Sequence, residues 1–168
     1  MKKLLISFLA TLLVSLTAIG QDFFFIGENS YPCTETFTLQ SNSDRSFVND
    51  LNVILGKDGS QALFLVSTKT VSTVRISEKL IIYLDDGTVI SCIDKGINDN
   101  VDDIASSAYY LTNDELAKMK NSNIHKVRYE IRCADCYESP LEGVYSASNK
   151  GSSRTDFPAV ITMFFSED

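Results

Sequence analysis

The segment KLIIYLDDGTVISCI, residues 79–93, constrains the fold of this chain more than any other. Its Asp86-Gly87 step supplies the positive φ that a tight hairpin turn requires, so the segment predicts a strand at 79–84 joined to a strand at 88–94. The first strand leaves neither face polar, which predicts a central strand covered on both sides. Such a strand is typical of a domain with two layers.

Similar patterns recur along the chain and predict further strands. In LNVILGKDGSQALFLV, residues 51–66, two apolar runs flank an Asp-Gly step, which predicts a second hairpin. The apolar segment DFFFIG follows residue 21, and residues 34–39 alternate threonine with larger side chains. The segment AVITMFF, residues 159–165, predicts a closing strand.

One segment changes to a helical pattern. Thr112 with Glu115 three residues later matches a capping box, which predicts a helix of two to three turns ending near residues 121–123. With strands expected at about 107–111 and from 124, this forms a β-α-β unit. The crossover is just long enough for parallel pairing, although antiparallel pairing is possible if the helix caps the sheet end. The fold class expected is therefore α+β, mainly β: one domain of antiparallel hairpins in two layers, with one short helix.

The N-terminus has the pattern of a secretory signal peptide. Lys2 and Lys3 precede an apolar run of 16 residues, and small residues lie just before Gln21, where we expect cleavage. The run is shorter than the roughly 18 residues expected of a membrane-spanning helix. Removal of residues 1–20 leaves a single domain at 21–168. We therefore expect a secreted or periplasmic protein that does not span the membrane after cleavage.

Charge narrows the class of partner. The net charge of −7 becomes −9 when Lys2 and Lys3 leave with the signal peptide. A surface this negative repels nucleic acid and anionic lipid unless a local basic patch exists, so we expect no nucleic acid as partner. The densest basic stretch lies at residues 126–132, where Lys126, Arg128 and Arg132 fall on one face of the expected strand together with Glu130. We interpret it as a solvated sheet face.

Cysteine usage fits an oxidising compartment. Four cysteines in an exported chain predict disulfides, with three pairings possible. Loop entropy favours the pairing of Cys33 with Cys92 and of Cys133 with Cys136. A redox role for the C-x-x-C is disfavoured because the residues that follow, 137–140, are a poor helix start. A zinc site is disfavoured because a second close-spaced pair is missing, and no cofactor is expected.

Two polar segments are interpreted as loops. Residues 95–106 are acidic and read as a connection, and residues 146–156 have the composition of a mobile loop. Asn98, Asn100 and Asp102 have the spacing of a calcium loop. However, Asp103 stands where that loop needs glycine and Tyr109 where it needs glutamate, which favours a solvated connection.

The search for catalytic groups gives little. The only histidine, His125, is expected on the same face of a strand as Val127, Tyr129 and Ile131, because these residues are two positions apart. This spacing predicts that His125 is a partly buried strand residue. Motifs for a serine nucleophile, a zinc protease, a phosphate loop or a dinucleotide are absent from the sequence. A carboxylate pair for glycoside hydrolysis needs no local motif and stays an alternative.

The segment LIIYLDDGTVI, followed by Tyr109-x-Leu111-Thr112, Glu115-Leu116, Lys118-Met119 and then Ile124 to Arg128, resembles a family of small exported proteins of Bacteroidetes-type bacteria. The resemblance covers about residues 75–132. It implies a Gram-negative envelope or extracellular setting and brings no known activity or catalytic residue.

The function expected from the sequence is that of an exported, non-enzymatic binding module for an unknown protein or glycan, as a monomer or weak oligomer. The alternatives are a secreted, glycan-acting hydrolase and a component of an envelope assembly that pairs through an exposed sheet edge, with FFFIG as the candidate edge. Residues expected in contact loops are Asp99, Asp102, Asp103, Tyr109, Tyr137 and Tyr145.

Overall fold

A computed structural model describes residues 22–44, 48–77, 79–93, 97–134, 139–152 and 154–166. The strands are β1 (Asp22–Ile26), β2 (Asn29–Cys33), β3 (Phe37–Ser41), β4 (Leu51–Asp58), β5 (Gln61–Lys69), β6 (Val74–Ile76), β7 (Lys79–Leu84), β8 (Val89–Ile93), β9 (Asn98–Val101), β10 (Ile104–Leu111), β11 (Ile124–Cys133) and β12 (Gly143–Ser148). The helices are α2 (Asn113–Asn121) and α3 (Phe157–Phe164).

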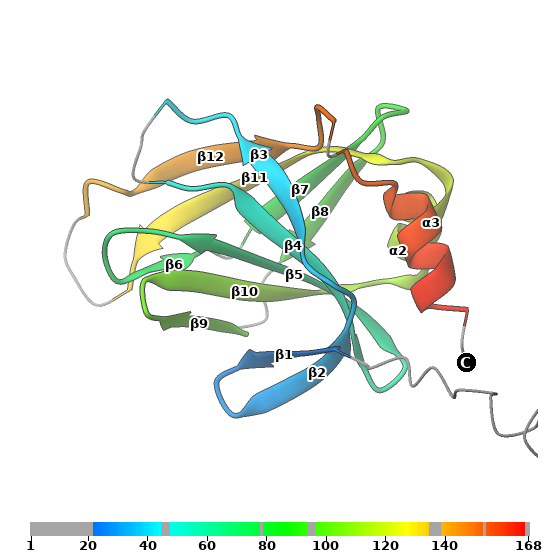
Figure 1. Cartoon of the computed structure of the whole chain (residues 1–168), viewed down its shortest axis with the longest axis horizontal. Coiled ribbons are helices and arrows are strands. Elements are labelled where there is room, and N and C mark those ends of the chain that lie inside the picture. The colour runs from blue at the N-terminus through cyan, green and yellow to red at the C-terminus, as the bar shows by residue number, and fades with distance from the viewer. Residues whose placement is uncertain are drawn as a thin grey trace, which may run out of the picture.

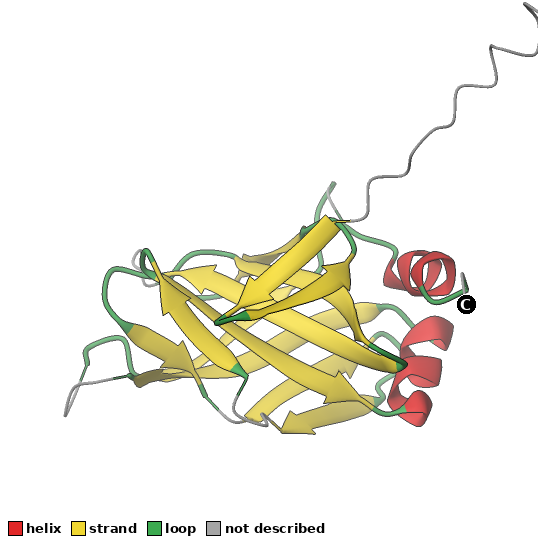
Figure 2. Ribbon diagram, turned by 90° about the horizontal axis from the view of Figure 1, so that it is seen from below, coloured by secondary structure: helices red, strands yellow, loops and turns green. Residues whose placement is uncertain are grey.

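The strands form one curled antiparallel sheet. Its order is β8-β7-β11-β12-β3-β4-β5-β10-β9, with the β1–β2 hairpin attached at β4 and β6 attached at β11. Figure 1 shows the sheet rolled on itself, and Figure 2 shows the two helices together at one end of the roll. The expected class, mainly β with antiparallel hairpins, is confirmed. Within the described residues no helix has the length and apolarity that crossing a bilayer requires.

The Asp-Gly steps correctly predicted the position of two hairpins. The two Asp-Gly steps lie in the β4–β5 and β7–β8 turns, where Gly59 and Gly87 have φ of +57° and +87°. The expectation that residues 95–106 form a plain connection is wrong, since β9 and the start of β10 form a further hairpin there. Its turn residues Asp102 and Asp103 have φ of 53° and 62°. Two successive positive φ values mark a type I′ turn, and Asp tolerates them better than most residues.

The helices close one end of the roll. In α2 the Thr112 hydroxyl accepts from the Glu115 amide at 3.2 Å and the Glu115 carboxylate accepts from the Thr112 amide at 2.8 Å, which confirms the capping box. The strand expected at 159–165 is wrong, because residues 159–164 lie in α3 and Phe165 is its C-cap. Asp156 caps that helix by accepting from the Ala159 amide at 3.2 Å, and Phe157 and Ile161, four residues apart, are buried in the core.

The expected parallel pairing within the β-α-β unit is also wrong. β10 pairs with β5 and β9, whereas β11 pairs with β7, β12 and β6, and every one of these pairs is antiparallel. Helix α2 therefore crosses from one part of the rolled sheet to the other and buries Met119 in the core. Since β10 and β11 do not pair with each other, the antiparallel pairing considered as the alternative for this unit is not observed either.

Side-chain alternation divides the apolar residues into two clusters. In β4 and β5, Val53 and Phe64 belong to the main core inside the roll, while Ile54 and Leu65 belong to a smaller cluster on the outer face. The β1–β2 hairpin covers this smaller cluster with Ile26 and Tyr31, among others. Because alternate residues of a strand point to opposite faces, the two clusters lie on opposite sides of the same sheet.

Polar contacts join the edges of the roll. The Tyr109 hydroxyl donates to the Ser77 carbonyl at 2.9 Å, and the Asn100 side-chain amide donates to the Val74 carbonyl at 2.7 Å. The first bond joins β10 to the residue that follows β6, and the second joins β9 to β6. The described β6 pairs with β11 and has no strand pairing with β9 or β10.

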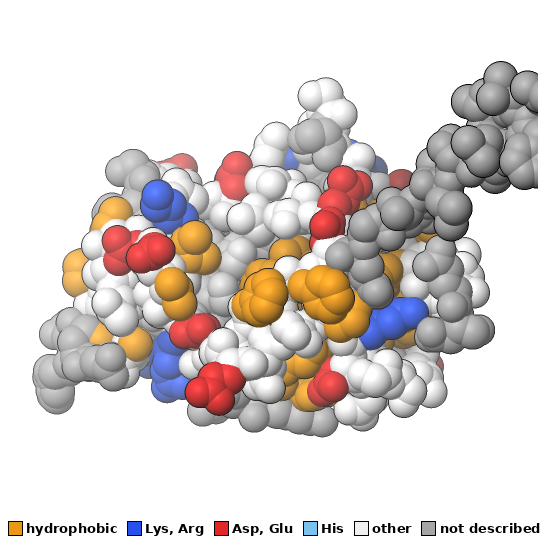
Figure 3. Space-filling view, turned by 60° about the horizontal axis from the view of Figure 1, so that its bottom comes forward, with side chains coloured by type: hydrophobic (Ala, Val, Ile, Leu, Met, Phe, Trp, Pro, Cys, Tyr) orange, Lys and Arg blue, Asp and Glu red, His pale blue; other side chains and the backbone are white. Residues whose placement is uncertain are grey.

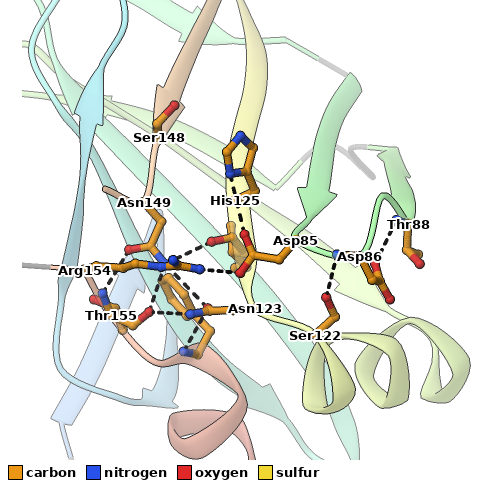
Figure 4. Close-up of polar contacts among 12 residues, drawn as sticks. Asp85, Asp86, Thr88, Ser122, Asn123, His125, Ser148, Asn149, Arg154 and Thr155 are labelled. Atoms are coloured by element: carbon orange, nitrogen blue, oxygen red, sulfur yellow. Dashed lines mark hydrogen bonds and ion pairs between the residues drawn. The ribbon is translucent and has the colours of Figure 1, made fainter. Parts of the chain in front are cut away.

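The segment 146–156 is not the loose loop that its composition suggested. Ser146–Ser148 belong to β12, and Asn149 is buried, with 5% of its surface exposed. The Asn149 side-chain amide donates at 2.9 Å to the carbonyls of both Ile124 and Thr155, and its oxygen accepts from the Thr155 amide at 2.9 Å (Figure 4). One buried amide group therefore fixes the approach to α3 against β11.

The pairing of Cys33 with Cys92 is wrong, because both are buried free thiols. Cys33 lies in the smaller outer cluster and Cys92 in the main core, so the sheet separates them. Cys133 is disulfide-bonded. Its expected partner, Cys136, lies outside the described residues, so that pairing stays a prediction.

We expect Cys33 and Cys92 to resist a thiol reagent in the native protein. Burial, aided by Asp22, raises the pKa of Cys33 to about 11, and burial, aided by Glu115, raises the pKa of Cys92 to about 12. A raised pKa keeps both groups as neutral thiols at about pH 8, where the thiolate is the reactive form. Labelling in guanidinium chloride without reductant should then modify two cysteines, counted by intact mass. Labelling of none there, or of both in the native protein, would contradict this assignment.

Candidate functional site

The outer face of β7, β11 and β12 carries the most distinctive grouping of side chains on the described surface. In the register of these strands Arg128 lies opposite Ile81 on one side and Ser146 on the other. Lys126 likewise lies opposite Tyr83 and Ser148. Since Val127 and Tyr129 point into the core, these alternate residues point outward.

A register shift between Ile124 and Lys126 sets this orientation. Ile124 is fully buried, whereas the side chain of His125 is 62% exposed. The expectation that His125 shares the inward face with Val127 and Tyr129 is therefore wrong. An irregularity of this kind adds a residue to one strand and reverses which side chains point inward beyond it. The alternation of residue types in the sequence does not indicate where such an extra residue lies.

Three adjoining depressions run across this face, with volumes of about 270, 150 and 410 Å³. Arg128 and Val144 line the first two, and Lys79 and Glu130 line the last two, so each depression adjoins the next. We call the charged residues that line them the basic strip. Among the described residues these are five cations and two carboxylates, with a net charge of +3: Arg75, Lys79, Lys126, Arg128, Arg132, Glu130 and Glu142.

The cations of the strip are only partly neutralised. Arg132 pairs with Glu130 at 2.7 Å, and the Glu142 carboxylate accepts from the Cys133 amide at 2.9 Å. Within the described part of the chain, Arg75, Lys79 and Arg128 form no ion pair.

The strip also carries a local electrostatic cost. Arg75 lies directly opposite Arg132 in the β6–β11 ladder. Like charges in that position are destabilising, while an exposed ion pair such as Arg132–Glu130 contributes only about 0–1 kcal/mol. The arrangement therefore gives the fold no net stability that would explain it.

Apolar and hydroxyl groups lie between the cations. Ile81 and Val144 line the 150 Å³ depression beside Arg128, and the ammonium of Lys126 lies 4.8 Å from the centre of the Tyr83 ring. The side-chain amide of Asn42 donates to the hydroxyls of Ser146 and Ser148 at 3.2 and 2.8 Å. The surface is thus a shallow amphipathic strip with several hydrogen-bonding groups, and not an enclosed pocket of the kind that holds a small cofactor.

A second polar cluster surrounds Asp85, in the turn between β7 and β8. Its carboxylate contacts the Arg154 guanidinium and lies 3.5 Å from Nδ1 of His125 (Figure 4). That second separation is too long for a good hydrogen bond. Ser148 lies on the neighbouring strand, but its hydroxyl accepts from Asn42, and no hydrogen bond to His125 is present among the described residues. A Ser-His-Asp catalytic arrangement is therefore not assembled here.

The residues with calcium-like spacing do not form a loop. Asn98 and Asn100 lie in β9, and the Asn100 side chain is used to bind the Val74 carbonyl. In the part of the chain that the structure describes, no group of three or more His, Cys, Asp or Glu side chains could hold a metal ion.

The expected contact residues are scattered. Asp102 and Asp103 are exposed at the tip of the β9–β10 hairpin, and the Asp99 carboxylate accepts from the Gly27 amide at 2.9 Å. Tyr109 and Tyr145 are buried, so their rings are not available as open contact surfaces. Tyr137 lies outside the described residues.

The sequence reading missed Arg75 and Lys79 as partners of the β11 cations. Lys126, Arg128 and Arg132 were visible as an alternating stretch, but Arg75 and Lys79 come from other strands. Only the register of β6 and β7 against β11 brings the five together. No signal local to residues 75–79 indicates that pairing.

No family model, no curated protein and no solved structure matches this chain.

Proposed function

We propose that this chain is an exported, non-enzymatic binding module that contacts its ligand through the basic strip. The observation that carries the proposal is a group of five cations, four of them without an ion pair among the described residues, on a chain whose net charge is −7. Like charges placed opposite each other, as Arg75 and Arg132 are, do not stabilise the fold. Arrangements of this kind are expected at functional sites. The proposal that the chain is exported is supported by the signal-peptide pattern of residues 1–20.

Binding is favoured over hydrolysis by the surroundings of the strip's carboxylates. Glu130 and Glu142 line the same 410 Å³ depression, which also holds Arg75, Lys79 and Arg132. Glycoside hydrolysis needs one carboxylic acid kept protonated, usually by an apolar pocket. The two glutamates instead lie among cations, with one ion-paired to Arg132 and the other hydrogen-bonded to the Cys133 amide.

The strip can be tested with charge-reversal variants exported by the native host. We expect Lys126→Glu together with Arg128→Glu to lower retention of the protein on the host envelope by about tenfold or more, since the variant replaces attraction by repulsion at two of the five cations of the strip. Lys118→Glu on α2 is the matched control, because this exposed lysine lies on a helix outside the strip. Unchanged retention in the double variant, with thermal unfolding like that of the wild type, would contradict the proposal.

A second candidate function is self-assembly through the edge of β1. Among the described residues β1 pairs only with β2. Phe24 and Ile26 point to the outer cluster, while Phe23 and Phe25 are 52% and 69% exposed. Figure 3 turns this side of the molecule toward the reader and shows hydrophobic side chains gathered on it. Antiparallel pairing of two copies about Phe24 would place each Phe23 beside the other copy's Phe25, a favourable aromatic cross-strand pair.

Size-exclusion chromatography with light scattering over a range of concentrations tests this assembly. We expect a concentration-dependent dimer that is lost in Phe25→Lys, because a charged side chain on an edge strand opposes pairing. Ile93→Lys, which alters an exposed side chain on β8, is the control. A monomer at every concentration would remove this candidate and leave the basic strip unaffected.

A further inference from the structure

The basic strip has a geometry that narrows the chemistry of its ligand. Outward residues two apart on a strand are separated by about 7 Å, so Lys126, Arg128 and Arg132 extend over about 20 Å. Lys79 and Arg75 lie alongside them on β7 and β6. The cations are therefore strung along a line and do not converge on one point. A single small anion reaches one or two of them, whereas a polymer with repeated negative groups reaches several at once.

We propose that the strip binds an acidic polysaccharide, with carboxylate or sulfate groups repeated along the chain. This inference rests on the proposed function of the strip as a contact surface. Together the three depressions offer the groups that such a ligand needs: cations for its charges, aliphatic surface for the apolar faces of sugar rings, and hydroxyl groups for sugar hydroxyls.

The residues between the cations are those that we expect to contact the sugar rings and their hydroxyl groups. Val144 is 53% exposed and lies with Ile81 and Arg128 around the 150 Å³ depression, which gives a ring an apolar surface beside a charge. Ser146 and Asn42 line the 270 Å³ depression together with Lys126 and Arg128. The Ser146 hydroxyl accepts from Asn42 and can donate its own hydrogen to a sugar hydroxyl, while the neighbouring cations bind the acid groups.

A nucleic acid fits the same surface less well. With +3 on the strip, the rest of the chain carries −10 and repels any polyanion that extends past the strip, so charge alone does not separate a nucleic acid from an acidic glycan. Binding of single strands also relies on exposed aromatic rings that stack on bases. Among the described aromatic residues of this face, Tyr129 and Tyr145 are buried, and the partly exposed ring of Tyr83 lies against the Lys126 ammonium.

The test measures direct binding of the purified exported protein to labelled oligomers by fluorescence anisotropy. The probes are polygalacturonate as a carboxylated glycan, chondroitin sulfate as a sulfated glycan, dextran as a neutral glycan, and single-stranded DNA. We expect at least one acidic glycan to bind about tenfold or more tightly than dextran and DNA. That affinity should fall with added salt, because the contacts are exposed charges.

Variants then place the binding on the strip. Arg128→Glu should weaken binding of the acidic glycan by about tenfold or more, and Arg128→Gln, which removes the charge without reversing it, by a smaller factor. Lys118→Glu should stay within about twofold of the wild type. The Arg128→Gln variant keeps the test valid if the reversed charge disturbs the fold, since a neutral side chain of similar length is tolerated at an exposed strand position.

Three results would overturn the inference. They are DNA binding as tight as that of the acidic glycans, glycan binding that Arg128→Glu leaves unchanged, and no binding of either acidic glycan. If neither glycan binds but Lys126→Glu with Arg128→Glu still releases the protein from the host envelope, the ligand class is wrong and the strip remains the contact surface. If envelope retention is also unaffected, the proposed function fails with it.

Discussion

Alternation along the strands of a curled sheet is the constraint on which the rest of this structure depends. The strands that line the inside of the roll place alternate side chains in its core, so the register of each decides which residues remain outside. In β11 the shift between Ile124 and Lys126 makes that choice. It puts Val127, Tyr129 and Ile131 in the core and leaves Lys126 and Arg128 outside. The basic strip is thus a consequence of how the apolar side chains are buried.

The strip and the rest of the surface have opposite charge. The stability of the domain comes from the core inside the roll and from the smaller cluster beneath the β1–β2 hairpin, since exposed charges contribute little. The outward cations are therefore open to selection for binding. A positive strip on an acidic body attracts an anionic ligand along one line and repels anions elsewhere, which gives orientation and selectivity more than raw affinity.

Features set by neighbouring residues were predictable from the sequence. The two Asp-Gly hairpins and the Thr112 capping box depend on residues within a few positions of each other, and all three are present. Features set by distant contacts were not. α3 consists of residues that also suit a strand, and its end cap at Asp156 and its packing in the core decide the outcome. The turn of the β9–β10 hairpin consists of two aspartates and lacks the usual glycine.

The site was less predictable than the fold for the same reason. The free thiols of Cys33 and Cys92 follow from their burial on opposite sides of the sheet, which no spacing in the sequence reveals. The exposure of His125 follows from a single irregularity in β11. Three of the strip's cations stood out as an alternating stretch, but their meaning depended on Arg75 and Lys79, which join them only through strand pairing.

A cysteine scan along β11 tests the central claim most directly. Each residue from 126 to 131 is replaced in turn by cysteine, and the rate of reaction with a charged thiol reagent is measured on the folded protein. The account predicts fast labelling at 126, 128 and 130 and slow labelling at 127, 129 and 131, because the first set points outward and the second into the core. The opposite alternation, or equal rates at all six positions, would contradict it.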